Sequence, residues 1–269
     1  MTTIGADPEL FVTLDKEPVS AYKLIPGTKE KPFKVYGGAV QVDGTALEFN
    51  INPVKSKTDF IRNIEGVQKL MKAMVLAKGD YSFSLSPSVQ YSQETFDKMK
   101  EEEKAIGCEP DMNAYTFDMN PKTEDMITSR IRSAGGHIHI GDYSKAKKGS
   151  WEFFCDCARM ARLMDQELGV YSLLWDGDDN RRKTYGVPGS FREKEYGVEY
   201  RTLSNAWLSN RKLLEIVWDF TLDAVNKFKK TDEQDDIDTY YQEILLCNDT
   251  KSSFFKCNEK AEKVMEAIT

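Results

Sequence analysis

The chain has 269 residues, 40% of them hydrophobic and 30% charged, which is enough to bury one large core or two modest ones. It contains no apolar run of roughly 18 residues or more, and its N-terminus lacks the basic start and apolar stretch of a signal peptide, so we expect a cytoplasmic protein without a membrane span. The net charge of −7 argues against a nucleic-acid partner, and five cysteines without a C-x-x-C pair predict reduced thiols rather than a zinc site or disulfide framework.

Helical and strand-like periods alternate along the chain and predict an α+β fold. In chain order, the elements are strands at Glu9–Leu14 and Val40–Ile51, a helix at about Lys57–Ala77, a strand at Tyr81–Val89, a charged and exposed helix at Gln93–Lys104, a strand at Gly136–Gly141, a helix at about Ser150–Leu174, a strand at Gly197–Leu203, and helices at about Asn210–Phe228 and Ser252–Ala267. No low-complexity linker divides them, which predicts one domain over residues 1–269. Strands with one polar and one apolar face favour an antiparallel sheet packed on helices on one side.

The helical periods also predict which side chains face the core. The expected buried positions are Phe60, Ile61, Ile64, Val67, Leu70, Met71 and Met74 in the first long helix, Trp151, Phe154, Ala158, Ala161 and Met164 in the second, and Leu213, Leu214, Val217, Trp218, Leu222 and Val225 in the third.

Four predicted strands carry polar side chains at i and i+2, which lie on the same face of a strand. These pairs are Asp7 with Glu9, Glu48 with Asn50, His137 with His139, and Glu199 with Arg201. A half-exposed strand also alternates in this way, so each pair alone has an ordinary structural interpretation. Four such strands in one sheet would nevertheless gather carboxylates, imidazoles and a guanidinium on one surface.

The histidine pair is the strongest of these signals, because the chain has only two histidines and they are two residues apart. Gly135, Gly136 and Gly141 flank them, and glycine lets a ligand or another backbone segment approach closely. Barrel and cupin sites that use H-x-H need further histidine ligands, which this chain lacks.

A surface dominated by carboxylates favours hard cations such as Mg²⁺ or Mn²⁺, and arginine among them suits phosphate. That combination is what phosphoryl transfer requires. Asp176–Asn180 does not fit a calcium loop, since its sixth position is Arg181 and its twelfth is Val187, and is interpreted as a tight turn. No P-loop or G-x-G-x-x-G motif is present, so bound ATP would lie on the sheet surface.

Several motifs resemble known ligases. Ser133–His139 is similar to the S-G-x-H-x-H strand of glutamine synthetases, and Glu199–Arg201 to their E-x-R strand. Asp7–Glu9 and Leu47–Phe49 resemble the early acidic strands of γ-glutamylcysteine ligases. The order G-x-D-P-E, G-T-K, D-G-x-x-L-E-F-N, G-G-H-I-H-I-G and Y-G-x-E-Y-R-x-L-S-N resembles the phage-type COOH–NH2 ligase family over residues 4 to about 208.

This resemblance implies a curved, mostly antiparallel sheet with helices behind it, as in the glutamine synthetase and γ-glutamylcysteine ligase superfamily. It implies an ATP-dependent amidoligase of small-molecule or peptide substrates, in which a carboxylate is phosphorylated and an amine then displaces phosphate from the acyl phosphate. The implied cofactors are ATP and Mg²⁺ or Mn²⁺, and a phage-encoded enzyme of this kind would work in the host cytoplasm.

The resemblance also implies roles for single residues. The expected metal ligands are Glu9, Glu48, His137 and Glu199, with Asp7 as a further one; the expected catalytic groups are Arg201, Glu48, His139 and Arg192; and the expected contacts to ATP are His139, Arg201, Arg192, Arg132 and Lys29. Pro8 separates Asp7 from Glu9, which departs from the nearest ligases and leaves the role of Asp7 open.

Two alternatives remain at this point. A guanidino phosphotransferase would share the fold and stop at phosphoryl transfer, and a non-catalytic phage binding or structural protein would keep the fold without turnover. A small amino acid, a peptidoglycan peptide and a protein side chain are all candidate substrates.

Overall fold

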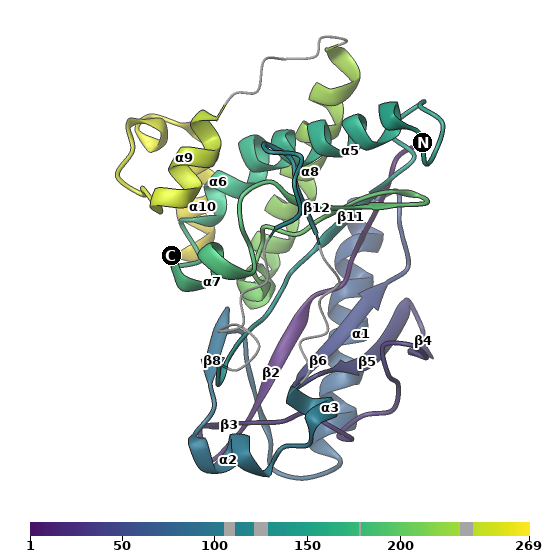
Figure 1. The fold of residues 1–269 in the computed structure, drawn as a ribbon, viewed down its shortest axis with the longest axis vertical. Helices are drawn as coiled ribbons and strands as arrows, with labels where there is room; N and C mark the ends of the chain where they lie inside the picture. The colour runs from purple at the N-terminus through teal and green to yellow at the C-terminus, as the bar shows by residue number, and fades with distance from the viewer. Residues whose placement is uncertain (105–110, 121–128, 178, 232–238) are drawn as a thin grey trace.

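The computed structural model describes residues 1–104, 111–120, 129–177, 179–231 and 239–269, and it has the α+β architecture that the sequence predicts (Figure 1). One antiparallel sheet has the strand order β1-β11-β13-β12-β9. Its strands are β1 (Thr3–Ala6), β11 (Ile138–Gly141), β13 (Gly197–Tyr200), β12 (Ser190–Lys194) and β9 (Met112–Asn113).

A second antiparallel sheet is built mainly from the first fifty residues, with the order β3-β2-β6-β5-β4 and β7 added beside β2. Its strands are β2 (Glu9–Leu14), β3 (Glu17–Val19), β4 (Phe33–Val35), β5 (Gly38–Asp43), β6 (Ala46–Ile51) and β7 (Ser82–Ser84), and a separate pair is formed by β8 (Ser88–Gln90) and β10 (Ile131–Ser133). The four predicted polar strands therefore lie in two sheets, and the prediction of a single sheet is wrong.

The two sheets meet at Asp7–Pro8, where the strand predicted to join Asp7 with Glu9 is interrupted. The amides of Asp7 and Glu9 donate to the carbonyls of His137 and Gly135, whereas the Pro8 carbonyl accepts from the amide of Phe49 in β6. Proline fits between the two donors because its own nitrogen has no hydrogen to donate. The chain thus leaves the first sheet and enters the second without losing contact with the segment that carries the histidines.

Three long helices begin close to the predicted residues. These are α1 (Lys57–Leu76), α5 (Trp151–Met164) and α8 (Arg211–Lys230), capped by the side chains of Ser56, Ser150 and Asn210. The helix predicted to reach Leu174 changes at Asp165–Gly169 into a π-helical turn, which is followed by α6 (Val170–Ser172). The remaining helices are α2 (Gln93–Lys98), α3 (Glu101–Lys104), α7 (Asp179–Thr184), α9 (Tyr240–Cys247) and α10 (Glu259–Ile268), with 3₁₀ turns at Asn205–Ser209 and Ser253–Phe255.

The helices cover the apolar faces of the sheets. α1 packs behind β5 and β6, α5 packs on β12 and β13, and α8 contacts both α1 and α5 (Figure 1). Phe60 of α1 packs against Trp207 and Trp218, with ring centroids 6.3 and 5.4 Å apart. One continuous apolar core therefore lies beneath both sheets. A smaller apolar cluster covers part of the opposite face of the second sheet, and its members are Phe11, Ala46, Val89, Tyr91, Met99 and Ala134. No helix among the described residues is long and apolar enough to cross a membrane.

Other boundaries differ from the predictions for local reasons. Val40–Ile51 is part of a hairpin, β5 and β6, because Gly44 adopts a positive φ of 56° and turns the chain. Tyr81–Val89 contains β7 and β8, which pair with different strands, and the helix predicted at Gln93–Lys104 divides at Met99, which is buried. Leu70 and Trp151, predicted to face the core, are 40% and 67% exposed. Of the cysteines in the described ranges, none forms a disulfide, and Cys108 lies outside them.

Candidate functional site

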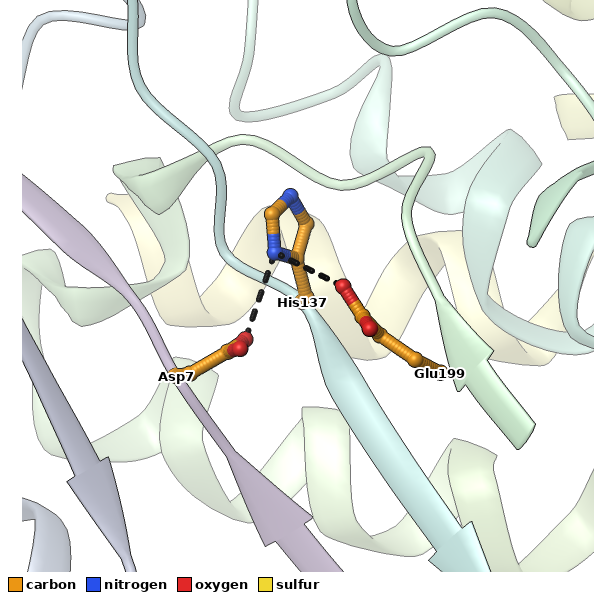
Figure 2. A group of neighbouring side chains, drawn as sticks. All are labelled: Asp7, His137 and Glu199. Atoms are coloured by element: carbon orange, nitrogen blue, oxygen red, sulfur yellow. Dashed lines mark ion pairs between the residues drawn. The ribbon is translucent and has the colours of Figure 1, made fainter. Parts of the chain in front are cut away.

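Asp7, His137 and Glu199 converge from three neighbouring segments of the first sheet, and we call them the histidine cluster (Figure 2). His137 Nδ1 lies 3.2 Å from a carboxylate oxygen of Asp7 and 3.6 Å from one of Glu199. His139 Nε2 lies 3.0 Å from the same Asp7 oxygen. The strand register explains this, since Gly5 lies opposite His139 and His139 lies opposite Glu199.

Cationic side chains surround Glu199 on the side of β12 and β13. Arg201 forms a close ion pair with it, and Lys194 Nζ lies 3.0 Å from its second oxygen. Arg192, which lies opposite Glu199 in the register, donates to it at 3.4 Å. Arg201 also contacts Asp111 at 3.2 Å, so its guanidinium bridges two carboxylates.

A second group, Glu9, Asp43 and Glu48, forms what we call the acidic cluster, in which the carboxylate oxygens lie within 4.8 Å of one another. Glu48 of β6 lies opposite Glu9 on one side and Gln41 on the other. The Gly135 amide donates to Glu9 at 2.6 Å, and the Gln41 amide donates to Glu48 at 2.9 Å. Glu9 and Glu48 are each only 9% exposed, so like charges are brought together under limited solvation.

Electrostatics separate the two clusters. Burial raises the pKa of Glu9 to about 7, with the charge of Asp43 adding to it. Burial, followed by the charges of Asp7 and Glu9, raises the pKa of Glu48 well above its usual value. These shifts follow from removing carboxylates from water and placing them beside one another.

For the two carboxylates of the histidine cluster, the cationic neighbours outweigh burial. Burial opposes ionisation of Glu199, but Arg201 compensates and lowers the pKa of Glu199 to about 2. Burial likewise opposes ionisation of Asp7, yet His139 and His137 hold its pKa well below the usual range. Burial and then the charge of Arg201 lower the pKa of His137 to about 4, whereas Asp7 raises the pKa of His139 against the effect of burial.

Gly135 and Gly136, which were predicted to permit close approach of a ligand or another backbone segment, are approached closely by other groups of the protein. A Cβ on Gly136 would lie 2.2 Å from the Ser204 carbonyl oxygen, and one on Gly135 would lie 2.2 Å from Nε2 of His137. Trp207 Nε1 donates to the Gly136 carbonyl at 3.1 Å, which fixes the turn before β11. These glycines therefore set the position of the His137 ring.

A cavity of about 350 Å³ opens beside both clusters. Asp7, Glu48, Asn50, His139 and Tyr196 contribute polar groups to its lining. Its remaining lining is small or apolar and consists of Thr3, Gly5, Ala6, Ile51, Pro53 and Gly141.

Most of the predicted site residues come together, but two cations lie further out. Lys29 Nζ pairs with Asp43 at 3.3 Å, at the margin of the acidic cluster. The guanidinium of Arg132 donates to the carbonyls of Lys104 and Ile131 at 2.7 and 2.9 Å. Arg132 also lies over the ring of Phe96, so its contacts hold β10 rather than either cluster.

Several residues of the site were missed by the sequence prediction. Asp43 lies two positions after Gln41 on β5, and an i, i+2 signal was available once the hairpin was recognised. Asp111, Lys194 and Tyr185 lie outside the motifs, and Tyr185 places its hydroxyl 3.3 Å from both Glu9 and His137. Asp176, in the segment rejected as a calcium loop, is buried and pairs with Arg182 at 3.3 Å, and a helix begins at Asp179; Asp178 lies outside the described residues.

Comparison with known proteins supports the resemblance predicted from the sequence. The profile of a family described as phage phiEco32-like COOH·NH2 ligase-type 2 matches residues 129–266, which is half of the chain. The match includes the histidine pair, Glu199 and Arg201, whereas the acidic cluster precedes it. Comparison with curated proteins gives no match. The chain therefore belongs to the phage phiEco32-like COOH·NH2 ligase-type 2 family, whose name denotes enzymes that join a carboxyl group to an amine.

Proposed function

We propose that the protein is an ATP- and Mg²⁺-dependent carboxylate–amine ligase that works through an acyl phosphate. In the first step the γ-phosphoryl group of ATP passes to a substrate carboxylate and ADP leaves. In the second, an amine attacks the acyl carbon, phosphate leaves, the amine loses a proton and an amide bond remains. The observation that carries this proposal is the pair of carboxylate clusters on neighbouring strands. In the histidine cluster, cationic side chains surround Glu199, and in the acidic cluster the carboxylates face one another.

The acidic cluster fits a divalent cation. Buried carboxylates are normally paired or bound to metal, and the raised pKa values of Glu9 and Glu48 reflect carboxylates whose charges are poorly compensated by their neighbours. The donor set is almost entirely oxygen, as Mg²⁺ and Mn²⁺ prefer. Glu9, Glu48 and Asp43 would hold one ion, and Asp7, His137 and Glu199 provide a second candidate set. A bound ion would neutralise phosphate oxygens during transfer.

The cations beside Glu199 are suited to the phosphate chain. Arg201 presents a planar pair of donors and is already oriented by Glu199 and Asp111. Arg192 and Lys194 extend the positive charge along β12, and His139 completes the surface from β11. We retain Lys29, at the margin of the acidic cluster, as a proposed contact to ATP. We do not retain Arg132, because its guanidinium is committed to backbone carbonyls.

We further propose that residues 1–269 act as one catalytic domain in the cytoplasm, where ATP is available. Asp7, Glu9 and Glu48 come from the first fifty residues, and the histidines and Arg201 come from the family-matched segment. Both halves contribute to the same buried core, so neither half holds the site alone.

The test is ADP release by the purified full-length chain, screened over pairs of acids and primary amines, with Mg²⁺ and with EDTA. We expect release that requires Mg²⁺ and both substrates, together with an equal amount of free phosphate. A stable phosphorylated product without free phosphate would favour a phosphotransferase instead. Absence of release with every pair, while the protein is folded by thermal melting, would contradict the proposal.

A further inference from the structure

The cavity beside the two clusters is built from one face of three strands. Thr3, Gly5 and Asp7 lie on one face of the β1 segment, His139 and Gly141 lie opposite them on β11, and Glu48 and Asn50 reach the cavity from β6. Because side chains at i and i+2 share a face, this is the open face that also carries the clusters. The cavity therefore adjoins the proposed site of phosphoryl transfer.

Two carboxylates and one imidazole, that of His139, line this cavity, so acidic groups outnumber the groups that can carry a positive charge. Its lining includes the carboxylates of Asp7 and Glu48 and, among the described residues, no lysine or arginine. The cations of the site lie on the other side of Glu199, on β12 and β13. An ammonium group would be attracted to Asp7 and Glu48, whereas these carboxylates would repel a phosphate or a second carboxylate. His139 is the imidazole of the lining and is already paired with Asp7 at 3.0 Å.

The size and shape of the cavity also limit what it can hold. Its volume of about 350 Å³ lies at the lower end of the range for small-molecule sites. Gly5 and Pro53, with the chain at Ala6 and Ile51, form a small wall without charged groups, which suits a short aliphatic chain.

We propose that this cavity binds the amine substrate, as a small aliphatic primary ammonium compound whose charge lies beside Asp7 and Glu48. The assignment rests on the proposed ligase function and deepens it. It gives the amine a place in the cavity, separate from the cations around Glu199 that would bind the phosphate. The amine would then lie next to the carbon activated by phosphorylation, and Asn50 and Tyr196 would contact the rest of the molecule.

A binding test that needs no known substrate uses cysteine labelling. Asn50→Cys places a thiol in the cavity, and Asn52→Cys places one two residues further along the chain, just beyond the end of β6, at an exposed position outside the lining. Each variant, in EDTA so that no divalent cation neutralises Asp7 or Glu48, is treated with 2-aminoethyl methanethiosulfonate (cationic) or 2-sulfonatoethyl methanethiosulfonate (anionic). Peptide-resolved mass spectrometry gives the rate at each engineered site apart from the native cysteines.

The ratio of the two rates cancels the reactivity of the thiol itself. We expect the cation-to-anion ratio at position 50 to exceed that at position 52 by about 10-fold or more, the usual gain from a focused local charge. Equal ratios at the two positions, or a preference for the anion, would overturn the assignment even if the enzyme releases ADP.

A kinetic test identifies the bound compound as the amine. A Cβ on Gly5 would lie 3.6 Å from the His139 Cβ and 3.8 Å from the Pro53 Cα, which is ordinary contact, so Gly5→Ala narrows the cavity without a clash. We expect a higher KM for the amine with unchanged KM for ATP and an unchanged melting temperature. A change confined to the KM for ATP would assign the cavity to the nucleotide. If no acid–amine pair releases ADP, the ligase function fails and the amine assignment fails with it, whatever the labelling ratio.

Discussion

The histidine cluster and the acidic cluster adjoin each other, but their carboxylates are balanced in opposite ways. Glu199 is surrounded by Arg201, Lys194 and Arg192, and its pKa falls to about 2 although it is buried. Glu9 and Glu48 face each other across β2 and β6 and are held by hydrogen bonds from Gly135 and Gln41. Cations thus stabilise the ionised form of buried Glu199, whereas like charges oppose the ionised forms of buried Glu9 and Glu48.

This difference separates two functions that one surface has to perform. A cluster whose charges are already paired can be held in a fixed geometry by the protein alone. A cluster whose charges repel would be stabilised by a divalent cation, because the cation would remove the repulsion. The contrast predicts that the same change, glutamate to glutamine, will have opposite effects on stability in the two clusters.

The largest effect is expected from Glu199→Gln. It leaves Arg201 beside a neutral amide in a buried position, and breaking a buried ion pair costs about 3–5 kcal/mol. Urea unfolding monitored by fluorescence measures this loss, and Glu195→Gln, at an exposed position in the adjoining turn, is the matched control. A Glu199→Gln variant as stable as the control would show that the cations do not depend on Glu199.

Glu48→Gln should lose activity without losing stability. The substitution keeps the hydrogen-bonded shape beside Gln41 and removes one of the repelling charges. We expect turnover to fall on the order of 10²-fold, while the melting temperature without divalent ions stays the same or rises. ADP release and a thermal melt of the same preparation test both parts. A loss of stability comparable to that of Glu199→Gln would remove the distinction between the clusters.

Arg201→Lys tests whether the planar guanidinium matters beyond its charge. Lysine retains the charge near Glu199 but cannot also span the distance to Asp111 with a second planar donor. We expect turnover to fall by roughly 10²-fold and stability to fall modestly. Steady-state ADP release and urea unfolding give the two values. Normal turnover in a destabilised variant would limit Arg201 to a structural role.

A smaller effect is expected from pH. The pKa of Glu9 is raised to about 7 by burial and by Asp43, above its value of 4.5 in an unfolded chain. The folded state therefore holds a proton that the unfolded state has lost, and this contribution to stability is full below pH 4.5 and disappears as the pH rises through 7. Without divalent ions, stability should decrease between pH 5 and 8 by on the order of 2 kcal/mol.

A second buried acid needs to be controlled for in that measurement. Burial raises the pKa of Asp165 to about 7, and its carboxylate accepts from the hydroxyls of Tyr200 and Tyr115. Asp165→Asn should remove its share of the pH dependence, and Mg²⁺ at pH 8 should restore the share that belongs to the acidic cluster. Urea unfolding at pH 5 and 8 measures both. A pH dependence unchanged by Mg²⁺ would show that the cluster does not bind the ion.

The strands and the site were predictable to different degrees. The i, i+2 pairing correctly grouped His137 with His139, because alternation on a strand is a local property. It could not show that the strand is interrupted between Asp7, which follows β1 of the first sheet, and Glu9, which begins β2 of the second, since that depends on tertiary contacts. Asp111 reaches Arg201 from ninety residues away, and no local pattern indicates such a contact. Tertiary packing likewise decides that cations balance the carboxylates of the histidine cluster, whereas the carboxylates of the acidic cluster face one another.

The most direct test of the central claim is a calorimetric titration of the full-length protein with a non-hydrolysable ATP analogue. We expect binding in the presence of Mg²⁺ and a large loss of affinity in EDTA, because the acidic cluster otherwise repels the phosphates. We also expect Glu48→Gln to weaken binding in Mg²⁺ more than in EDTA. Equal affinity of the wild-type protein under both conditions would contradict the proposal that the acidic cluster binds the cation.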